Sequence, residues 1–237
     1  MPWTELDTAN LPNGEVMTLR RNGADFEIRV GLYELMSSKN PVSERAMANL
    51  ATARLDRPAS RVLIGGLGMG YTVRAILDET GPAARITVAE LVPQVIAWNR
   101  GPLADLAARP LDDPRVEVAL GDVADIIRCH PGHFDIILMD VDNGPEAVMF
   151  DGNRSLYGED GLSLILTGLT PGGVLALWAA DASLAFECTV AAGGFDVERT
   201  GVAVSGHVAH TVYLVRPAKM PEAEGPTGAC NAAPRPL

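Results

Sequence analysis

A glycine-rich turn between two apolar segments constrains this 237-residue chain more than any other feature. The apolar segment Val62–Ile64 leads into a turn that contains Gly65, Gly66, Gly68 and Gly70. An amphipathic helix is expected from Thr72 to about Thr80, and a second apolar segment then ends on an acid, Glu90. This order predicts a strand–turn–helix–strand unit, which is the first half of a nucleotide-binding α/β fold.

The spacing of these glycines excludes two phosphate-binding loops. A dinucleotide fingerprint, G-x-G-x-x-G, needs a third small residue where this chain has Tyr71 or Val73. No G-K-[S/T] follows the turn, so a P-loop is excluded as well. What remains is G-x-G-x-G, with Glu90 about 20 residues after Gly70, the offset at which an acid can accept the hydroxyls of a ribose. That pattern resembles class I S-adenosylmethionine (AdoMet) enzymes; the alternative is an α/β domain whose glycines only form a tight turn.

Composition and charge narrow the range of functions. Hydrophobic residues make up 47% of the chain, which is typical of a globular protein, and the net charge of −11 argues against a nucleic-acid-binding surface. An acidic protein is compatible with a cationic substrate such as an amine. Three unpatterned cysteines favour a reducing cytoplasm over a disulfide framework. We expect no signal peptide and no membrane span, because no apolar run reaches about 18 residues. A small-molecule substrate and a homodimer are the expected partners.

Residues 1–58 are expected to form an N-terminal appendage. Asn22-Gly23, between the strand-like segments Glu15–Leu19 and Phe26–Val30, is a strong signal for a β-hairpin. Ser43 is expected to cap a helix that packs against the main sheet. Residues 59–217 would then form the nucleotide-binding domain, and the proline-rich residues 218–237 a disordered tail.

The α/β alternation continues after Glu90. The chain is expected to form a helix from Pro93, a strand at Val116–Ala119, a helix at Val123–Cys129, a strand at Phe134–Met139, a helix around Leu162–Leu169 and a strand at 174–180. Asp181 is expected to cap a further helix. Too little chain separates the last two strands, Phe195–Arg199 and Thr211–Val215, for a crossover helix, so they should pair antiparallel. The sequence therefore predicts a doubly wound, mostly parallel seven-stranded sheet with a terminal antiparallel pair.

Four acids fall at the expected strand ends, where open parallel sheets bind their ligands: Glu90, Asp122, Asp140 and Asp142. Asp122 could bond the amino group of an adenine. Asp140 and Asp142 could hold a protonated amine and accept its proton as the nitrogen attacks carbon. Alternatively, Asp142 belongs only to a turn, since Asp-Asn-Gly-Pro is a favourable turn sequence.

Other residues allow a structural interpretation beside a functional one. Cys129-His130-Pro131-Gly132-His133 resembles part of a metal site, but no further Cys/His pair lies nearby in the sequence, so we expect a surface turn and no metal. Tyr157 could line an acceptor pocket or simply pack in the core. The remaining aromatic and imidazole candidates are expected in the core (Trp98, Trp178) or in a loop (His207, His210).

From about Tyr33 to Pro217 the chain resembles the spermidine synthase family. The matching segments are VLIGGLGMGYTVRA, VAEL, GDVADII, FDIILMDVDNGP and LYGEDGLSLILTGLTPGG. The resemblance implies that Glu90 binds the ribose of the donor, that Asp122 contacts its adenine and that Asp140 deprotonates the acceptor amine. It also implies the reaction, in which an aminopropyl group moves from decarboxylated AdoMet to putrescine.

The chain departs from the family pattern at two places. In the family an aspartate of the glycine loop holds the free amine of the donor, and the aligned residue here is Met69. The second acid after the fourth strand is displaced to Asp142, which could replace the missing acid, as could Glu34 more weakly. Three functions therefore stay open: aminopropyl transfer from decarboxylated AdoMet, methyl transfer from AdoMet to a small molecule, and binding of an adenosyl ligand without catalysis.

Overall fold

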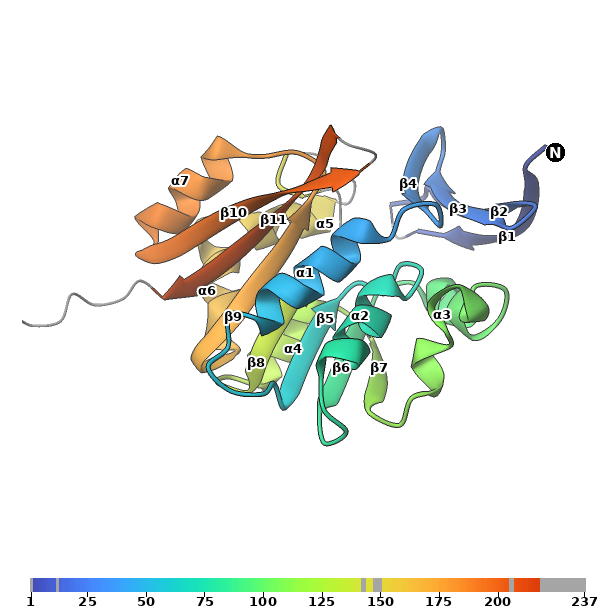
Figure 1. The fold of residues 1–237 in the computed structure, drawn as a ribbon. Coiled ribbons are helices and arrows are strands. Elements are labelled where there is room, and N and C mark those ends of the chain that lie inside the picture. Colours follow the sequence, from blue (N-terminus) through green and yellow to red (C-terminus); the bar gives the residue numbers. More distant parts are fainter. Residues whose placement is uncertain (1, 12, 142–143, 147–150, 205–206, 218–237) are drawn as a thin grey trace, which may run out of the picture.

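The computed structural model describes residues 2–11, 13–141, 144–146, 151–204 and 207–217, and they form two sheets. The smaller sheet is N-terminal, antiparallel and ordered β1-β2-β3-β4 (Figure 1). The larger sheet is ordered β10-β11-β9-β8-β5-β6-β7. The N-terminal sheet lies at the end of the larger sheet where the parallel strands finish, so that the two sheets face a common space.

The N-terminal sheet contains the expected hairpin and two further strands. Its strands are β1 (Thr4–Asn10), β2 (Val16–Asn22), β3 (Asp25–Val30) and β4 (Tyr33–Ser37). The Asn22-Gly23 hairpin is confirmed: β2 pairs with β3, with Leu19 opposite Ile28, and both side chains are buried. The outer strands carry no regular alternation of apolar residues; in β1 only Ala9 is buried. This is why the sequence pattern did not predict them.

The larger sheet confirms the predicted seven-stranded, mostly parallel fold. Its parallel strands are β5 (Arg61–Gly65), β6 (Arg85–Glu90), β7 (Val116–Leu120), β8 (Phe134–Met139) and β9 (Leu169–Ala179). The antiparallel strands are β10 (Phe195–Val204) and β11 (His207–Pro217), and β11 inserts between β10 and β9. Every residue of β8 is buried, as expected for a parallel strand with helices on both faces.

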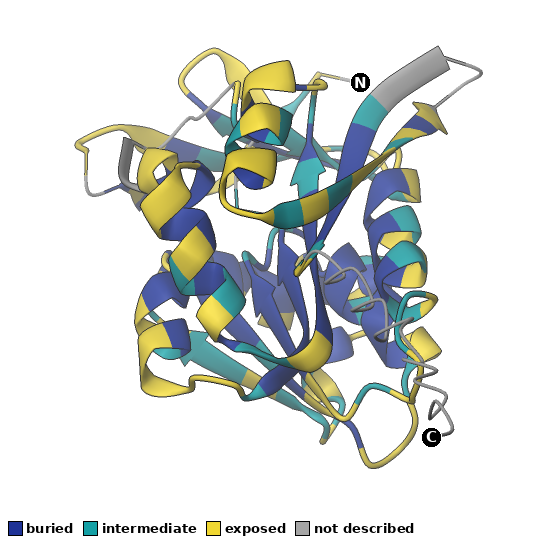
Figure 2. Ribbon diagram, turned by 90° about the vertical axis from the view of Figure 1, so that its left-hand side faces the viewer, coloured by how far each residue is buried: buried dark blue, intermediate teal, exposed yellow. Residues whose placement is uncertain are grey.

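Helices cover both faces of this sheet and enclose two hydrophobic clusters (Figure 2). One face carries α1 (Val42–Thr52), α2 (Tyr71–Glu79) and α3 (Pro93–Arg100). The other carries α4 (Val123–Cys129), α6 (Glu159–Thr167) and α7 (Leu184–Ala192). A short helix, α5 (Asp151–Arg154), and 3-10 turns at Ala104–Ala107, Pro110–Asp112 and Ser155–Tyr157 complete the described elements. Helix α1 contacts α2 and β9, so it packs on the main sheet as expected.

Two of the predicted helix caps are wrong. Helix α1 begins after Pro41, so Ser43 lies inside its first turn and donates its hydroxyl hydrogen to Glu44 instead of capping. Helix α7 is capped by Ser183, whose hydroxyl oxygen accepts the backbone N–H of Phe186 at 3.1 Å, and not by Asp181. Ser183 has the extended backbone of an N-cap residue, and its side chain is buried against the helix end.

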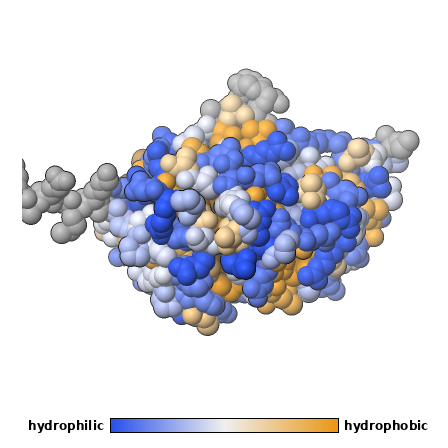
Figure 3. Space-filling model, turned by 60° about the horizontal axis from the view of Figure 1, so that its bottom comes forward, coloured by the Kyte–Doolittle hydropathy of each residue, from blue (hydrophilic) through white to orange (hydrophobic). Residues whose placement is uncertain are grey.

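The surface of the protein is mainly polar on the side that Figure 3 turns forward. Hydrophilic residues dominate this view, and hydrophobic residues appear as scattered spots among them. Within the described part of the chain, no helix has both the length and the apolar character needed to cross a membrane.

Candidate functional site

A cavity of about 840 Å³ lies between the carboxyl ends of the parallel strands, helix α1 and the N-terminal sheet. Six of the ten residues that the sequence assigned to a functional site line it: Glu34, Gly66, Gly68, Glu90, Asp122 and Asp140. Apolar side chains from the N-terminal sheet, among them Met17, Ile28 and Met36, form its opposite wall. Three other candidates, Gly65, Gly70 and Tyr157, are absent from the described lining, and Asp142 lies outside the described residues.

The glycine turn contains three residues whose backbone conformations favour glycine. Gly66, Gly68 and Gly70 have φ angles of +90°, +52° and +81°, a region that disfavours residues with a Cβ atom. A Cβ atom on Gly66 would lie 2.1 Å from the backbone oxygen of Asp140, so this glycine also lets the ends of β5 and β8 approach each other. Gly65 packs inside the sheet and Gly70 precedes the first turn of α2. These two glycines therefore shape the turn, and Gly66 and Gly68 face the cavity.

Glu90, at the end of β6, is a buried carboxylate held by backbone donors. Its side chain is 8% exposed; Oε2 accepts the N–H of Leu67 at 3.0 Å, and Oε1 accepts the N–H of Val92 at 2.8 Å. Burial raises the pKa of Glu90, and the backbone hydrogen bonds oppose that shift because they favour the charged form. The carboxylate thus has a fixed orientation beside the glycine turn, with lone pairs available to ligand hydroxyls.

Asp122 lines the cavity just beyond the end of β7. It is the N-cap of α4, where its Oδ1 accepts the N–H of Ala124 at 2.8 Å. The backbone of Gly121 next to it is tied to the carbonyl of Glu90 at 2.9 Å. The ends of β6 and β7 therefore place Glu90 and Asp122 together.

Asp140, at the end of β8, is fixed from two directions. Its backbone N–H donates to the carbonyl of Gly65 at 2.9 Å, and its Oδ2 accepts the hydroxyl of Thr72 at 2.6 Å. Burial raises the pKa of Asp140, and the hydrogen bond from Thr72 partly offsets this effect. A carboxylate with a raised pKa is a stronger base, so this position is suited to proton transfer.

Helix α1 and strand β11 add residues that sequence reasoning missed. Glu44 lines the cavity, is 7% exposed and has a pKa raised to about 7, mainly by burial and also by the charge of Asp140. The hydroxyl of Ser43 donates to Oε2 of Glu44 at 2.8 Å, and Nδ1 of His210 lies 2.9 Å from the same hydroxyl oxygen. The ring of Trp178 meets His210 edge-on at 4.9 Å, and both line the cavity.

These positions correct one expectation. His207 and His210 were expected in a loop, but both belong to β11. Trp178 packs against the core as expected, and it is only partly buried because it also lines the cavity. Glu44 did have a signal in the sequence. At helical spacing it shares a face with Met47, Ala48 and Ala51, which are all buried. An acid on the apolar face of a helix is unusual and points to a functional or paired carboxylate.

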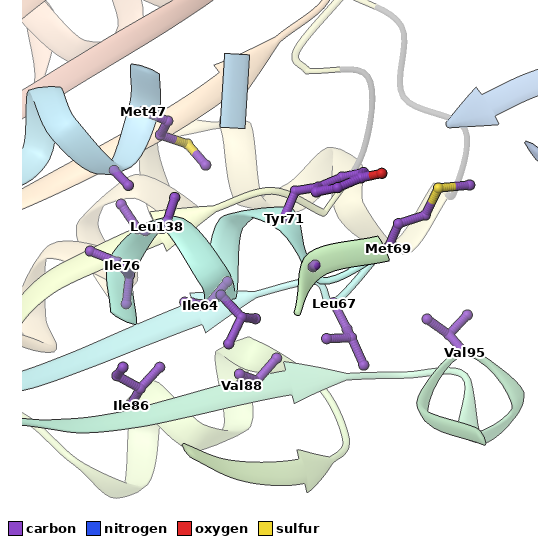
Figure 4. Close-up of a cluster of buried hydrophobic side chains, with 14 of the residues drawn as sticks. Met47, Ile64, Leu67, Met69, Tyr71, Ile76, Ile86, Val88, Val95 and Leu138 are labelled. Carbon is purple, nitrogen blue, oxygen red and sulfur yellow. The ribbon is translucent and has the colours of Figure 1, made fainter. Parts of the chain in front are cut away.

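Met69 does not line the cavity, although alignment with the family placed it beside the amine of the donor. Its side chain is fully buried in the hydrophobic cluster that contains Leu67, Tyr71 and Val95 (Figure 4). Its backbone N–H faces the sulfur of Met36 at 3.2 Å, which ties the turn to the N-terminal sheet. The glycine turn therefore contributes no acid to the described cavity wall.

The remaining candidates lie in structural settings. Tyr157 is 7% exposed and meets Phe186 edge-on at 6.4 Å. His130 and His133 pack against each other with ring centroids 5.3 Å apart. Among the described residues, no group of three or more histidine, cysteine or acidic side chains could hold a metal ion.

Comparisons with known proteins relate the chain to aminopropyltransferases. No family model matches. A polyamine aminopropyltransferase of Mycobacterium tuberculosis is 32% identical over 124 residues, which are 51% of this chain and 23% of that protein. One from Thermoanaerobacter sp. is 31% identical over 117 residues, 46% of this chain and 41% of that protein. The matched segments thus span less than half the length of these relatives.

Solved structures show the same fold. A spermidine synthase from Thermotoga maritima has a TM-score of 0.68 at 18% identity, covering 89% of this chain and 72% of that one. A probable spermidine synthase from Corynebacterium glutamicum has a TM-score of 0.61 at 18% identity, covering 90% and 78%. The resemblance to the spermidine synthase family is confirmed in sequence and in fold.

Proposed function

We propose that this chain is an aminopropyltransferase that uses decarboxylated AdoMet as donor and a polyamine-type amine as acceptor. The observation that carries the proposal is a single cavity with two kinds of acid. Glu90 and Asp122 line it near the glycine turn, and beyond them lie the half-buried Asp140 and the buried Glu44, whose pKa is raised in part by the charge of Asp140. The first pair suits an adenosine, and the second suits a reacting amine.

In this reaction, different residues of the cavity bind the donor and accept the proton. Glu90 accepts the ribose hydroxyls, Asp122 accepts the adenine amino group, and Gly66 and Gly68 allow the donor to lie against the backbone. The acceptor nitrogen attacks the methylene carbon beside the sulfonium of the donor. A C–N bond forms, the C–S bond breaks and its electron pair goes to sulfur, which leaves methylthioadenosine. Asp140 accepts the proton that the nitrogen loses.

The charge of the cavity favours the decarboxylated donor over ordinary AdoMet. Five acids line it (Glu34, Glu44, Glu90, Asp122 and Asp140), against the cation Lys39 and a histidine, His210, whose pKa is lowered by burial. Decarboxylated AdoMet carries a sulfonium and an ammonium, both of which an acidic cavity attracts. Ordinary AdoMet adds a carboxylate, which the same acids repel. Methyl transfer is the second candidate, because the glycine turn and Glu90 would bind its adenosyl part equally well.

Products identify the reaction. The protein is incubated with each donor and a diamine such as putrescine, and the nucleoside product is read by mass spectrometry. Formation of methylthioadenosine supports aminopropyl transfer. Formation of S-adenosylhomocysteine would show instead that the protein transfers a methyl group. Binding of both donors without either product would leave an adenosyl-binding module. A cytoplasmic location and a homodimer are further proposals, which fractionation and light scattering test.

A further inference from the structure

Glu44 is a buried carboxylate in the part of the cavity that also holds the half-buried Asp140. It projects from the first turn of α1, is 7% exposed and lines the same cavity as Asp140. None of the ion pairs between described residues involves either acid. Two acids that share a poorly solvated space without a cation oppose each other's ionisation.

The groups around Glu44 show what would relieve this opposition. The charge of Asp140, at the end of β8, raises the pKa of Glu44, and the charge of Arg45 on α1 lowers it by less. Tyr71 on α2 is neutral, and its own pKa is raised by burial and by the charge of Glu44. A positive charge beside the two carboxylates would relieve their repulsion, and a cationic ligand could bring that charge into the cavity.

A chain of side chains fixes the Glu44 carboxylate. The single hydroxyl proton of Ser43 is donated to Glu44 when that acid is ionised, so the Ser43 oxygen accepts from His210 Nδ1. The pKa of His210 is lowered by burial, so the ring is neutral at pH 7 and carries its proton on Nδ1. The edge-on contact with Trp178 holds the ring in place. Ser43 and His210 therefore hold Glu44 as a hydrogen-bond acceptor oriented by α1 and β11.

We propose that Glu44 binds a primary ammonium group of the substrates, with Ser43 and His210 as positioning residues. The inference rests on the proposed function, in which both the donor and the acceptor carry such a group. The glycine turn supplies no acid to the described wall, because Met69 is buried in the core. Glu44 supplies a carboxylate from a different element. Charge pairing here would also favour decarboxylated AdoMet, which carries two positive charges, over ordinary AdoMet, which adds a carboxylate.

Binding measurements on the full chain test this role. Calorimetry is performed with methylthioadenosine, which lacks the ammonium, with decarboxylated AdoMet, and with putrescine in the presence of methylthioadenosine. In Glu44→Gln, we expect the affinity for at least one ammonium ligand to fall about 10- to 100-fold, the effect of losing one charge-assisted hydrogen bond. The affinity for methylthioadenosine should stay within about twofold.

Ser43→Ala and two control variants sharpen the test. Ser43→Ala should give the same ligand-selective loss at smaller size, a pattern that a purely structural defect would not produce. Glu117→Gln, on an exposed position of β7 outside the cavity, is the matched control and should leave all affinities unchanged. Glu34→Gln removes an exposed acid from another wall of the cavity.

The possible outcomes distinguish the proposed role of Glu44 from the proposed function of the protein. A selective loss with decarboxylated AdoMet assigns Glu44 to the donor ammonium, and one with putrescine assigns it to the acceptor; both support the inference. Equal affinities in Glu44→Gln and the parent, or a selective loss in Glu34→Gln alone, overturn it while leaving the proposed function intact. A parent protein that binds neither nucleoside overturns the proposed function itself.

Discussion

The two ends of the cavity are built on different principles. At the end proposed to bind the nucleoside (the nucleotide end), the turn, Glu90 and Asp122 lie within one continuous stretch of about 60 residues, residues 62–122. At the end proposed for the reaction (the reacting end), Ser43 and His210 meet across a sequence separation of 167 residues, and Asp140 comes from a third element between them. The first end is a local motif, whereas the second exists only after α1, β8 and β11 have packed together.

The acids at the two ends of the cavity also differ in their hydrogen-bond partners. Glu90 and Asp122 accept from backbone N–H groups, which keep their protons and fix the orientation of each carboxylate. Asp140 and Glu44 accept from the hydroxyls of Thr72 and Ser43, which can donate or accept. The nucleotide end is therefore suited to binding and the reacting end to taking up a proton. Substitutions at each end test this division.

The largest effect is expected at Asp140. Asp140→Asn keeps the shape of the side chain and an acceptor for Thr72 but removes the base, so turnover should fall by about 10²-fold or more. Affinity for methylthioadenosine should be retained, because the nucleotide end is untouched. Steady-state kinetics with calorimetry measures both quantities. Near-parental turnover in the variant would place the proton acceptor elsewhere and remove the distinction between the two ends.

Gly66→Ala should disrupt the nucleotide end through the backbone. The substitution combines a φ of +90° with a Cβ position 2.1 Å from the backbone oxygen of Asp140, so β5 and β8 must separate locally. We expect a loss of about 2–4 kcal/mol in the free energy of unfolding, together with weaker nucleoside binding. Denaturant unfolding followed by calorimetry measures the two effects.

Gly132→Ala separates the two causes of that loss. Gly132 also has a positive φ, +60°, but an added Cβ would meet nothing within 4 Å. This variant should lose only about 1 kcal/mol and bind nucleosides normally. Similar losses in the two alanine variants would mean that the close approach of β5 and β8 is unimportant.

Glu90→Ala should weaken every adenosyl ligand to a similar extent. The ribose hydroxyls would lose a charge-assisted acceptor, which is worth about 1.5–3 kcal/mol of binding free energy. Because methylthioadenosine and both forms of AdoMet share the ribose, calorimetry should give parallel losses for all three. A folded variant with unchanged affinities would show that the ribose binds elsewhere.

The difference between a local motif and a site assembled from distant segments also explains what could be predicted from the sequence. The strand–turn–helix–strand unit and the succession of strands and helices that follows it were predicted because each depends on apolar periodicity and turn residues close together in the chain. Gly66, Glu90, Asp122 and Asp140 could be placed at one edge because parallel strands end there. The N-terminal strands β1 and β4 were not predicted, because β1 buries only Ala9 and no residue of β4 is buried, so neither shows a regular apolar period.

Residues at the reacting end could not be placed in this way. His210 was expected in a loop because the length of β11 depends on pairing with β9 and β10, which local pattern does not report. Met69 was assigned by alignment to a position facing the ligand. In the structure it lies between Gly68 and Gly70, which both have positive φ angles, and its side chain is directed into the core. Glu44 was detectable as an acid on an apolar helix face, but its closeness to Asp140 depends on how α1 packs on the sheet.

The smallest expected effect concerns stability. The pKa of Glu44 in the folded protein is about 7, above its usual 4.5, so the folded state binds the proton more tightly than the unfolded state. This contribution to stability is fully present below pH 4.5 and is lost as the pH rises through 7. Asp140, Arg45 and Tyr71 contribute to the field at Glu44, and His210 is linked to it through Ser43.

Glu44→Gln removes this pH dependence without removing the side chain. The ligand-free variant should be about as stable as the parent near pH 4.5 and more stable at pH 8, by on the order of 1–2 kcal/mol, less than the shift alone implies because water enters the cavity. Urea unfolding at several pH values measures the difference, and Glu117→Gln should change stability by less than about 0.5 kcal/mol at every pH. A stability difference that is independent of pH would show that Glu44 is not held protonated by its surroundings. The gain at pH 8 should shrink when an ammonium ligand is added, because only the parent carboxylate pairs with it.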